Sequence, residues 1–334
     1  MIFRLMALLL FLAGILPMAQ AEENQPVAIV IHGGAGTILK SKMTPETEQA
    51  YRRELEAAVR AGHEVLMAGG SSREAIVAAI VLMEDSELFN AGKGAVFTQS
   101  GKVELDASIM DGKSLEAGAV TGIRRIKNPI VLANDVLEHS VHVMLMGEGA
   151  EEYAASRGFE FVDNSYFYTE RRREQLRRVQ QSDGETALSE DDDDARKLGT
   201  LGAVAIDRQG TIAAATSTGG MTNKRFGRIG DSPIIGAGTY ADNGVCGISA
   251  TGHGEYFIRA AVAHDICARA AYQDVTLQEA ADQVIQKKLV DMGADGGIIG
   301  IDRFANIVFS FNSEGMYRAA IDREGKLQVR IFRE

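Results

Sequence analysis

The sequence has little cysteine, little proline and no tryptophan, and it has fewer basic than acidic residues. With only two cysteines, Cys246 and Cys267, it can form neither a disulfide framework nor a cysteine zinc site, and whether the two pair stays open. Acidic residues outnumber basic ones by 46 to 35, for a formal net charge of −11, which argues against a nucleic-acid partner. Beyond the N-terminus, no apolar run is long enough to cross a bilayer.

The longest apolar run, at the N-terminus, has the features of a leader. Arg4 precedes apolar residues 5–17, and the small-x-small motif Ala19-Gln20-Ala21 follows. A membrane anchor would need about 20 apolar residues, which is more than this run offers. We expect residues 1–21 to be a secretory signal peptide and the mature protein to start at Glu22. The expected compartment is the periplasm, with no membrane contact after the leader is removed.

Capping residues and apolar periodicity predict the remaining elements. Thr44 caps a helix that starts at Pro45, and Ser71 with Glu74 forms the capping box of a second helix that runs to about Glu84. Further helices are expected from residue 129 and at 147–157, 255–272 and 277–292. Strands are expected at 27–31, 95–99, 102–107, 117–122, 201–206, 211–215, 234–241, 245–250, 297–302, 307–311 and 327–332. This order favours two stacked sheets covered by helices.

Charged residues gather between residues 159 and 198. Arginines at 171–173 and 177–178 are followed by four aspartates at 191–194. Blocks of like charge repel and resist burial, so we expect residues 159–198 to form a solvated or disordered connector. The aspartates lack the alternation and the glycine of a calcium loop.

The pair Gly199-Thr200 stands between this charged run and an apolar strand. Threonine often opens a strand for packing reasons alone. If the chain is cut before Thr200, however, the residue carries a nucleophilic hydroxyl and a basic amine together. The unperturbed pKa of an α-amine, about 7.7–8.0, suits proton transfer near neutral pH. A hairpin between this strand and the next would place Thr218 beside Thr200.

Two later segments supply complementary chemistry. Arg228 and Asp231 lie three residues apart in a glycine-rich loop, and such a pair can bind the carboxylate and ammonium of a zwitterion, although a surface ion pair has the same spacing. The segment Thr251-Gly252-His253-Gly254-Glu255 joins a strand to a helix N-terminus, where N–H groups can stabilise an oxyanion.

Three other motifs give weaker evidence of a function. The loop at residues 32–35 is typical of an esterase oxyanion loop, but no G-x-S-x-G elbow accompanies it. The G-x-G-x-x-A match at 236–241 precedes a turn instead of a helix, which disfavours a dinucleotide site. His139 and His142 have no third ligand at metal spacing.

Six blocks occur together and in order, and the match that they define extends over nearly all of the mature chain except the connector: H-G-G-A-G at 32–36, F-N-A-G-K-G at 89–94, G-T-L-G-A-V at 199–204, T-S-T-G-G at 216–220, G-R-I-G-D-S-P at 227–233 and T-G-H-G-E at 251–255. The chain thereby resembles the plant-type L-asparaginase/isoaspartyl peptidase family of N-terminal-nucleophile hydrolases. The resemblance implies an α+β fold, a four-layer αββα sandwich, made as a precursor that cuts itself. Residues 22–199 would be the α subunit and 200–334 the β subunit, assembled as (αβ)2.

The resemblance also implies roles for individual residues. Thr200 would be the nucleophile, with Thr218 tuning it and with Thr251 and Gly252 as the oxyanion hole. Asn90 would belong to the substrate pocket, in which Gly254 lines the site and Arg228 and Asp231 hold an L-aspartyl group. Catalysis would need no cofactor. A structural sodium ion would bind backbone carbonyls of the loop before and through Asn90, namely those of Met83, Glu84, Ser86, Phe89, Ala91 and Lys93.

The leader, Lys93 and the segment at 140–142 depart from the family pattern. The expected substrates are small molecules, L-asparagine and β-aspartyl (isoaspartyl) dipeptides, from which the enzyme would release L-aspartate. One alternative is a glycosylasparaginase-type amidase, which shares the Arg228–Asp231 and Thr251–Gly254 patterns. The other is a secreted binding protein in which the bond between Gly199 and Thr200 stays intact.

Overall fold

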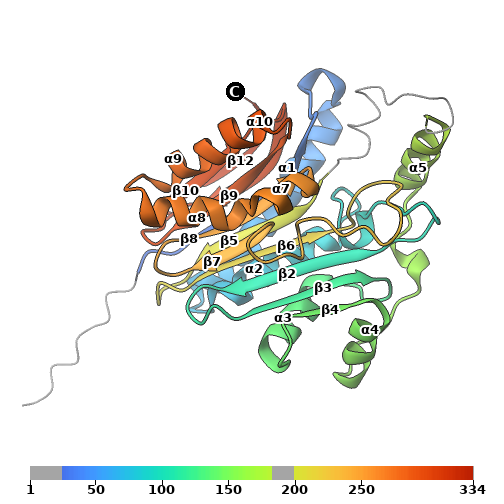
Figure 1. The fold of residues 1–334 in the computed structure, drawn as a ribbon, viewed down its shortest axis with the longest axis horizontal. Coiled ribbons are helices and arrows are strands. Elements are labelled where there is room, and N and C mark those ends of the chain that lie inside the picture. The colour runs from blue at the N-terminus through green and yellow to red at the C-terminus, as the bar shows by residue number, and fades with distance from the viewer. Residues whose placement is uncertain (1–24, 183–198, 334) are drawn as a thin grey trace, which may run out of the picture.

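Two β-sheets packed face to face form the centre of the protein. The computed structural model describes residues 25–182 and 199–333 (Figure 1). The predicted signal peptide, and the part of the predicted connector at 183–198, lie outside the described residues. The large sheet has the strand order β12-β11-β1-β5-β6-β2-β3-β4, and the small sheet has the order β10-β9-β8-β7.

The strands of the large sheet, in spatial order, are β12 (Leu327–Phe332), β11 (Gly315–Ile321), β1 (Ala28–Gly36), β5 (Leu201–Ile206), β6 (Ile212–Thr218), β2 (Leu105–Asp111), β3 (Ala117–Ile123) and β4 (Met144–Met146). Those of the small sheet are β10 (Ile307–Phe311), β9 (Gly296–Asp302), β8 (Cys246–Gly252) and β7 (Thr239–Asp242). Pairing is antiparallel except between β3 and β4, which run parallel.

Helices cover the outer faces of both sheets (Figure 1). Those against the large sheet are α1 (Pro45–Met67), α2 (Ser72–Glu84), α3 (Pro129–His139) and α4 (Gly147–Ser156). On the side of the small sheet lie α7 (Gly254–Ala260), α8 (Val262–Tyr272), α9 (Leu277–Asp282), the π-helical turn Gln283–Lys288 and α10 (Leu289–Asp291). Short 3₁₀ turns occupy Lys40–Lys42, Gly92–Gly94 and Asn164–Phe167.

Three apolar cores separate these four layers. One lies between the large sheet and its helices, one between the two sheets, and one between the small sheet and its helices. The predicted αββα sandwich is therefore confirmed. Among the described residues, no helix combines the length and apolar character needed to cross a membrane.

The predicted helix starts in the N-terminal half are confirmed by their caps. The Thr44 hydroxyl accepts the N–H of Thr47 (3.2 Å), and α1 begins at Pro45. Ser71 and Glu74 form the reciprocal capping box of α2, as their spacing predicts. These local signals act within one helical turn, which is why the sequence alone reveals them.

The connector prediction is wrong for residues 159–182. This stretch contains the Asn164–Phe167 turn and helix α5 (Glu170–Ser182). Arg172 is buried, and its Nε donates to the carbonyl oxygen of Gly94 at 2.7 Å, which gives the buried charge a partner. Arg171 donates to the carbonyl oxygens of Glu87 and Leu88. Their long side chains hydrogen-bond loop carbonyls, so the positive charge does not keep this segment in solvent.

Four smaller predictions also need correction. The hairpin over 95–107 is reduced to one isolated bridge, Phe97 to Val103. The helix expected at 255–272 is broken at Ala261, which has φ 49° because the next turn donates its N–H groups to the loop carbonyls of residues 236 and 237. The helix expected at 277–292 contains a π-helical turn. Strands β4 and β11 were not expected; a buried arginine, Arg318, interrupts the apolar pattern of β11.

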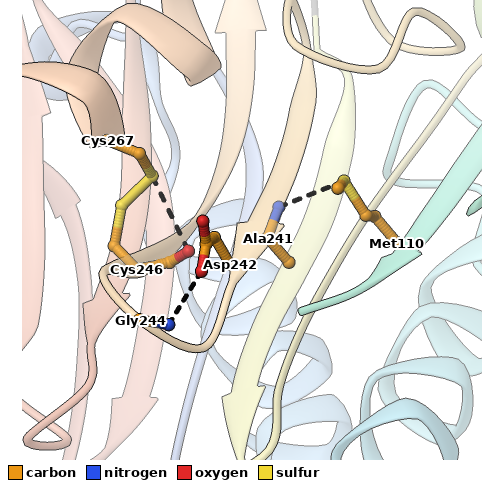
Figure 2. Close-up of a disulfide and its surroundings, with 6 residues drawn as sticks. All are labelled: Met110, Ala241, Asp242, Gly244, Cys246 and Cys267. Atoms are coloured by element: carbon orange, nitrogen blue, oxygen red, sulfur yellow. Dashed lines mark hydrogen bonds between the residues drawn. A yellow bond between two sulfur atoms is a disulfide. The ribbon is translucent and has the colours of Figure 1, made fainter. Parts of the chain in front are cut away.

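The two cysteines, whose pairing the sequence left open, form a disulfide. It joins Cys246 at the start of β8 to Cys267 in α8, with 5.9 Å between the Cα atoms (Figure 2). Both residues are buried in the core between the small sheet and its helices. The bond fixes α8 against the strand whose far end is Gly252.

Candidate active site

Thr200 lies at the start of β5, in the middle of the large sheet. Its hydroxyl donates to the hydroxyl of Thr218, with 3.1 Å between the oxygens. Leu201 pairs with Ser217 in the β5–β6 ladder, so the hairpin brings the two threonines together as predicted. The N–H of Gly220 also donates to Thr218 Oγ1 at 3.0 Å. The Thr218 oxygen therefore holds the Thr200 hydroxyl in a fixed direction.

The peptide bond before Thr200 is held by backbone from two other segments. The N–H of Asn90 donates to the carbonyl oxygen of Gly199 at 3.2 Å. Gly34 of β1 lies so close that a Cβ on it would overlap the Cα of Gly199. Gly199 has φ +91°, a conformation that residues with a side chain rarely adopt. The carbonyl oxygen of Gly199, in the peptide bond before Thr200, thus already accepts a hydrogen bond from the Asn90 N–H.

These groups open into one small pocket. Its lining combines most of the predicted site residues: Asn90, Gly199, Thr200, Thr218, Gly220, Met221, Arg228, Gly230, Asp231, Ser232 and Gly252. The Asn90 side chain is buried and donates to the carbonyl oxygen of Gly220 at 2.7 Å, which ties the loop before the 3₁₀ turn to the end of β6.

Arg228 enters the pocket from the loop between β6 and β7. Its guanidinium donates to both carboxylate oxygens of Glu255, at 2.9 Å from Nε and 3.0 Å from Nη2. The pairing differs from the surface ion pair with Asp231 that the spacing had left open. One edge of the planar guanidinium is thereby fixed, and the Nη1 edge remains for a ligand carboxylate.

Asp231 is 3% exposed, and its Oδ2 has no hydrogen-bond partner among the described residues. Burial raises the pKa of Asp231 to about 7, against the opposing effect of the Arg228 charge. A buried carboxylate oxygen without a partner is costly. A ligand ammonium placed in the pocket would provide both the charge and the hydrogen bond that this oxygen lacks.

Thr251 and Gly254 lie just behind the pocket, and Gly252 lines it. The Thr251 hydroxyl is buried and accepts the N–H of Ala35 at 3.3 Å, which leaves its own hydrogen to donate. Gly252 has φ +149°. A Cβ on Gly254 would come within 2.8 Å of Asp231 Oδ1 and 2.9 Å of Arg228 Nη2, so a residue without a side chain is needed there.

The loop from residue 83 to 94 offers backbone carbonyls and no cluster of metal-binding side chains among the described residues. The carbonyl oxygens of Glu84 and Phe89 face Gly92 and Gly94, where added Cβ atoms would overlap them. The Met83 and Ala91 carbonyls accept the N–H groups of Ser86 and Gly94. Carbonyl oxygens are ligands that a hard cation accepts, so a cation at this turn would be held by main-chain atoms.

Three contributors were not predicted for this site. Glu255 ends the T-G-H-G-E block, but no role was predicted for it, because its separation from Arg228 in the sequence does not indicate the contact. Gly34 also belonged to a quoted motif, but its approach to Gly199 depends on the pairing of β1 with β5. Arg171 lay in a segment taken for connector, yet it binds the loop that carries Asn90.

Comparison with known proteins agrees with this geometry. A family model described as asparaginase matches residues 24–331. The isoaspartyl peptidase of Escherichia coli K12 is 48% identical over 294 residues, covering 87% of this chain and 91% of the relative. The isoaspartyl peptidase/L-asparaginase of Homo sapiens is 39% identical over 306 residues, covering 92% and 96%, and that of Xenopus laevis is 40% identical over 305 residues, covering 91% and 94%. With its αββα sandwich and its match over nearly the whole chain, the chain belongs to the asparaginase family of N-terminal-nucleophile hydrolases.

Proposed function

We propose that this protein is a self-maturing threonine hydrolase that cleaves the side-chain amide of L-asparagine and of β-aspartyl dipeptides and releases L-aspartate. The observation that carries the proposal is that Thr200 and Thr218 line the same pocket as Arg228 and Asp231. The relatives named isoaspartyl peptidase support it. The glycosylasparaginase and binding-protein alternatives gain no support from those names.

Maturation begins when Thr200 Oγ attacks the carbonyl carbon of Gly199. The hydroxyl proton passes to the departing nitrogen, the C–N bond breaks, and Gly199 becomes esterified to Thr200 in an N-to-O acyl shift. The negative charge that develops on the Gly199 oxygen is stabilised by the Asn90 N–H, which already donates to it. Water then hydrolyses the ester and leaves Thr200 with a free α-amine.

Turnover uses the same oxygen with the new amine as base. The amine takes the proton of Thr200 Oγ while Oγ attacks the side-chain carbonyl of the substrate. The oxyanion is held by the Gly252 N–H and the Thr251 hydroxyl. The amine then protonates the leaving nitrogen, so that ammonia or an amino acid departs and an aspartyl ester remains. Water hydrolyses this ester with help from the same amine.

Specificity arises at the charged end of the pocket. Arg228 binds the α-carboxylate of the aspartyl group with the edge that Glu255 leaves open, and Asp231 binds its α-ammonium. An α-aspartyl peptide has this carboxyl group tied up in an amide, so it presents no carboxylate to Arg228. The pocket therefore selects β-linked over α-linked aspartyl peptides.

The test compares β-aspartyl-leucine with α-aspartyl-leucine on the matured protein. We expect cleavage of the β-linked dipeptide and of L-asparagine, with the α-linked dipeptide about ten- to a hundredfold slower, the scale of one lost charge-assisted pair. Equal cleavage of the two dipeptides would place the recognition of the aspartyl group elsewhere. No cleavage of any of the three would contradict the proposed function.

We further propose that the protein is exported to the periplasm and that its mature form is an (αβ)2 assembly. The leader at 1–21 and the Cys246–Cys267 disulfide both suit an oxidising compartment. The edge strand β4 and the residues before it expose Val141, Val143, Met144 and Met146, which supports burial against a second copy. Fractionation of the host should find protein starting at Glu22 in the periplasm, and light scattering should give the mass of two αβ units.

We also propose that the loop at residues 83–94 binds a structural sodium ion through its carbonyls, among which those of Glu84 and Phe89 belong to the predicted set. It would neutralise the carbonyl dipoles of the loop that carries Asn90, and catalysis would need no cofactor. The thermal midpoint should then rise with sodium more than with tetramethylammonium at equal ionic strength. An equal effect of both salts would argue against a specific site.

A further inference from the structure

A row of polar side chains crosses the otherwise apolar interface between the two sheets. His32, Ser108 and Thr216 come from strands β1, β2 and β6 of the large sheet, and Thr239 and Ser249 come from β7 and β8 of the small sheet. All five are fully buried. We call these five residues the hydroxyl network. The side chains beyond it in the same layer are apolar, among them Val204 and Ile299.

Thr216 is the centre of the network. Its Oγ1 lies 2.6 Å from Thr239 Oγ1, 2.7 Å from Ser249 Oγ and 3.0 Å from the carbonyl oxygen of Gly238. Ser249 Oγ in turn lies 3.0 Å from His32 Nε2. The Thr216 hydroxyl therefore contacts two hydroxyls of the small sheet and the carbonyl that precedes β7, and its removal would take one hydrogen bond from each of these three groups.

The network lies directly behind the reacting hydroxyls. In the large sheet, His32 pairs with Gly202, Gly202 with Thr216, and Thr216 with Ser108. Side chains two residues apart on a strand share a face, so Thr216 is the next residue behind Thr218 on the inner face. A Cβ on Gly202 would come within 2.6 Å of His32 Nε2. The network therefore packs directly against the Gly202 backbone, where there is no room for a side chain.

A second branch of the network reaches the substrate-binding loop. Ser108 Oγ lies 2.9 Å from Thr239 Oγ1 and 2.6 Å from the carbonyl oxygen of Ser232, the residue after Asp231. The hydroxyls thus contact the strand that ends at Thr218, the strand that ends at Gly252 and the loop that carries Asp231. Burial lowers the pKa of His32 to about 3, so its imidazole is neutral at the pH of turnover and adds no charge to this layer.

We propose that the hydroxyl network is a positioning device, in which Thr216 sets the spacing of the two sheets at the nucleophile and Ser108 sets the position of the Asp231 loop. The inference rests on the proposed function, because it assigns these residues to that same reaction. Neither residue lines the pocket, so each acts through Thr218, Gly252 or Asp231.

The experiment compares Thr216→Val, which keeps the shape and removes the hydroxyl, with Thr216→Ser, which keeps the hydroxyl. Val204→Ala is the control, since it perturbs the same layer on β5 without touching the network. Matured proteins are assayed with β-aspartyl-leucine at 25 °C, and thermal midpoints are measured in parallel. We expect Thr216→Val to lower kcat by about tenfold or more with KM within about twofold, the scale of a small misplacement of reacting groups.

Thr216→Ser should restore kcat to within about threefold of wild type, whereas Val204→Ala should lower the thermal midpoint without lowering kcat. Ser108→Ala, at the edge of the network, should instead raise KM by several-fold at nearly unchanged kcat. Equal loss of kcat in Thr216→Val and Val204→Ala, or a Ser108→Ala enzyme with wild-type KM, would show that the network only contributes stability. A wild-type protein without activity would contradict the proposed function itself, which separates the two failures.

Discussion

The two ends of the pocket are built in different ways. At one end, the neutral hydroxyls of Thr200 and Thr218 lie on paired strands in the centre of the large sheet. At the other end, the charges of Arg228 and Asp231 lie on the loop between β6 and β7, fixed by Glu255 and by burial. Bond making and substrate recognition are therefore separable. On the proposed function, maturation would need only the first end, because it acts on Gly199, whereas turnover would need both.

The largest effect should come from removing the hydroxyl of the first end. Thr200→Ala should remain one chain and show no activity, because it has no nucleophile for either reaction. Thr200→Ser should cut itself slowly, since it keeps the hydroxyl but lacks the β-branch that restricts χ1. Denaturing gel electrophoresis over time follows the cleavage. Processing of Thr200→Ala at the wild-type rate would show that another group or another protein cuts the chain.

A substitution behind the scissile bond should block maturation without touching the charged end. Gly34→Ala places a Cβ against Gly199, and Gly34 also has φ +113°. Gly69→Ala is the matched control, because Gly69 has φ +88° but no atom within 4 Å of its added Cβ. We expect Gly34→Ala to slow self-cleavage by about a hundredfold or more, as a misplaced reacting group does. Similar cleavage rates in the two variants would mean that the close approach does not matter.

At the charged end, Arg228→Lys should impair turnover and spare maturation. Lysine keeps the charge but loses the planar fork that holds Glu255 and the substrate carboxylate together. The loss of one charge-assisted pair is about 1.5–3 kcal/mol, or roughly one to two decades in kcat/KM for β-aspartyl-leucine. The variant should still mature to two chains. A variant that neither matures nor turns over would show that the two ends are not separable.

The smallest effect should come from pH, through Asp231. Because the pKa of this buried carboxyl is about 7, it is mostly neutral at pH 6 and mostly ionised at pH 8. Only the ionised form pairs with the α-ammonium, so KM for L-asparagine should fall by several-fold, up to about tenfold, between pH 6 and pH 8. In Asp231→Asn the KM should be high and independent of pH in this range. A wild-type KM that does not change with pH would assign the ammonium to another group.

Ionisation of the same carboxyl at higher pH should lower the stability of the protein, although it strengthens substrate binding. Its pKa is raised in the folded state, so the unfolded chain releases the proton first, and the native state loses stability as pH rises from 4 to about 7. Asp231→Asn should remove part of this loss and raise the thermal midpoint at pH 8. The residue is thus expected to serve binding at a cost in stability, which the thermal midpoints of both proteins at pH 5 and pH 8 measure.

The sequence predicted the parts of this architecture that local chemistry decides. The caps at Thr44 and Ser71, the strand after Thr200 and the hairpin that brings Thr218 beside it all follow from patterns within about 20 residues. What it missed depends on distant contacts. The helix α5 forms because its arginines reach the carbonyls of another loop, and the pairing of Cys246 with Cys267 depends on how α8 packs on β8.

The residues of the site show the same division. The six motifs marked the positions of Thr200, Thr218, Arg228 and Asp231, and the structure brings these residues into one pocket. The partner of Arg228 could not be predicted, because Glu255 and Asp231 offer the same charge and only the fold decides between them. Their roles, and the cleavage before Thr200, remain predictions for experiment.

The most direct measurement of the central claim is the intact mass of the protein purified from its host, with the N-terminus of each chain determined after denaturing separation. The account predicts two chains that appear without added protease, the smaller one beginning at Thr200 and accounting for residues 200–334. A single chain that keeps the bond between Gly199 and Thr200 through prolonged incubation, or a cut at any other bond, would contradict it.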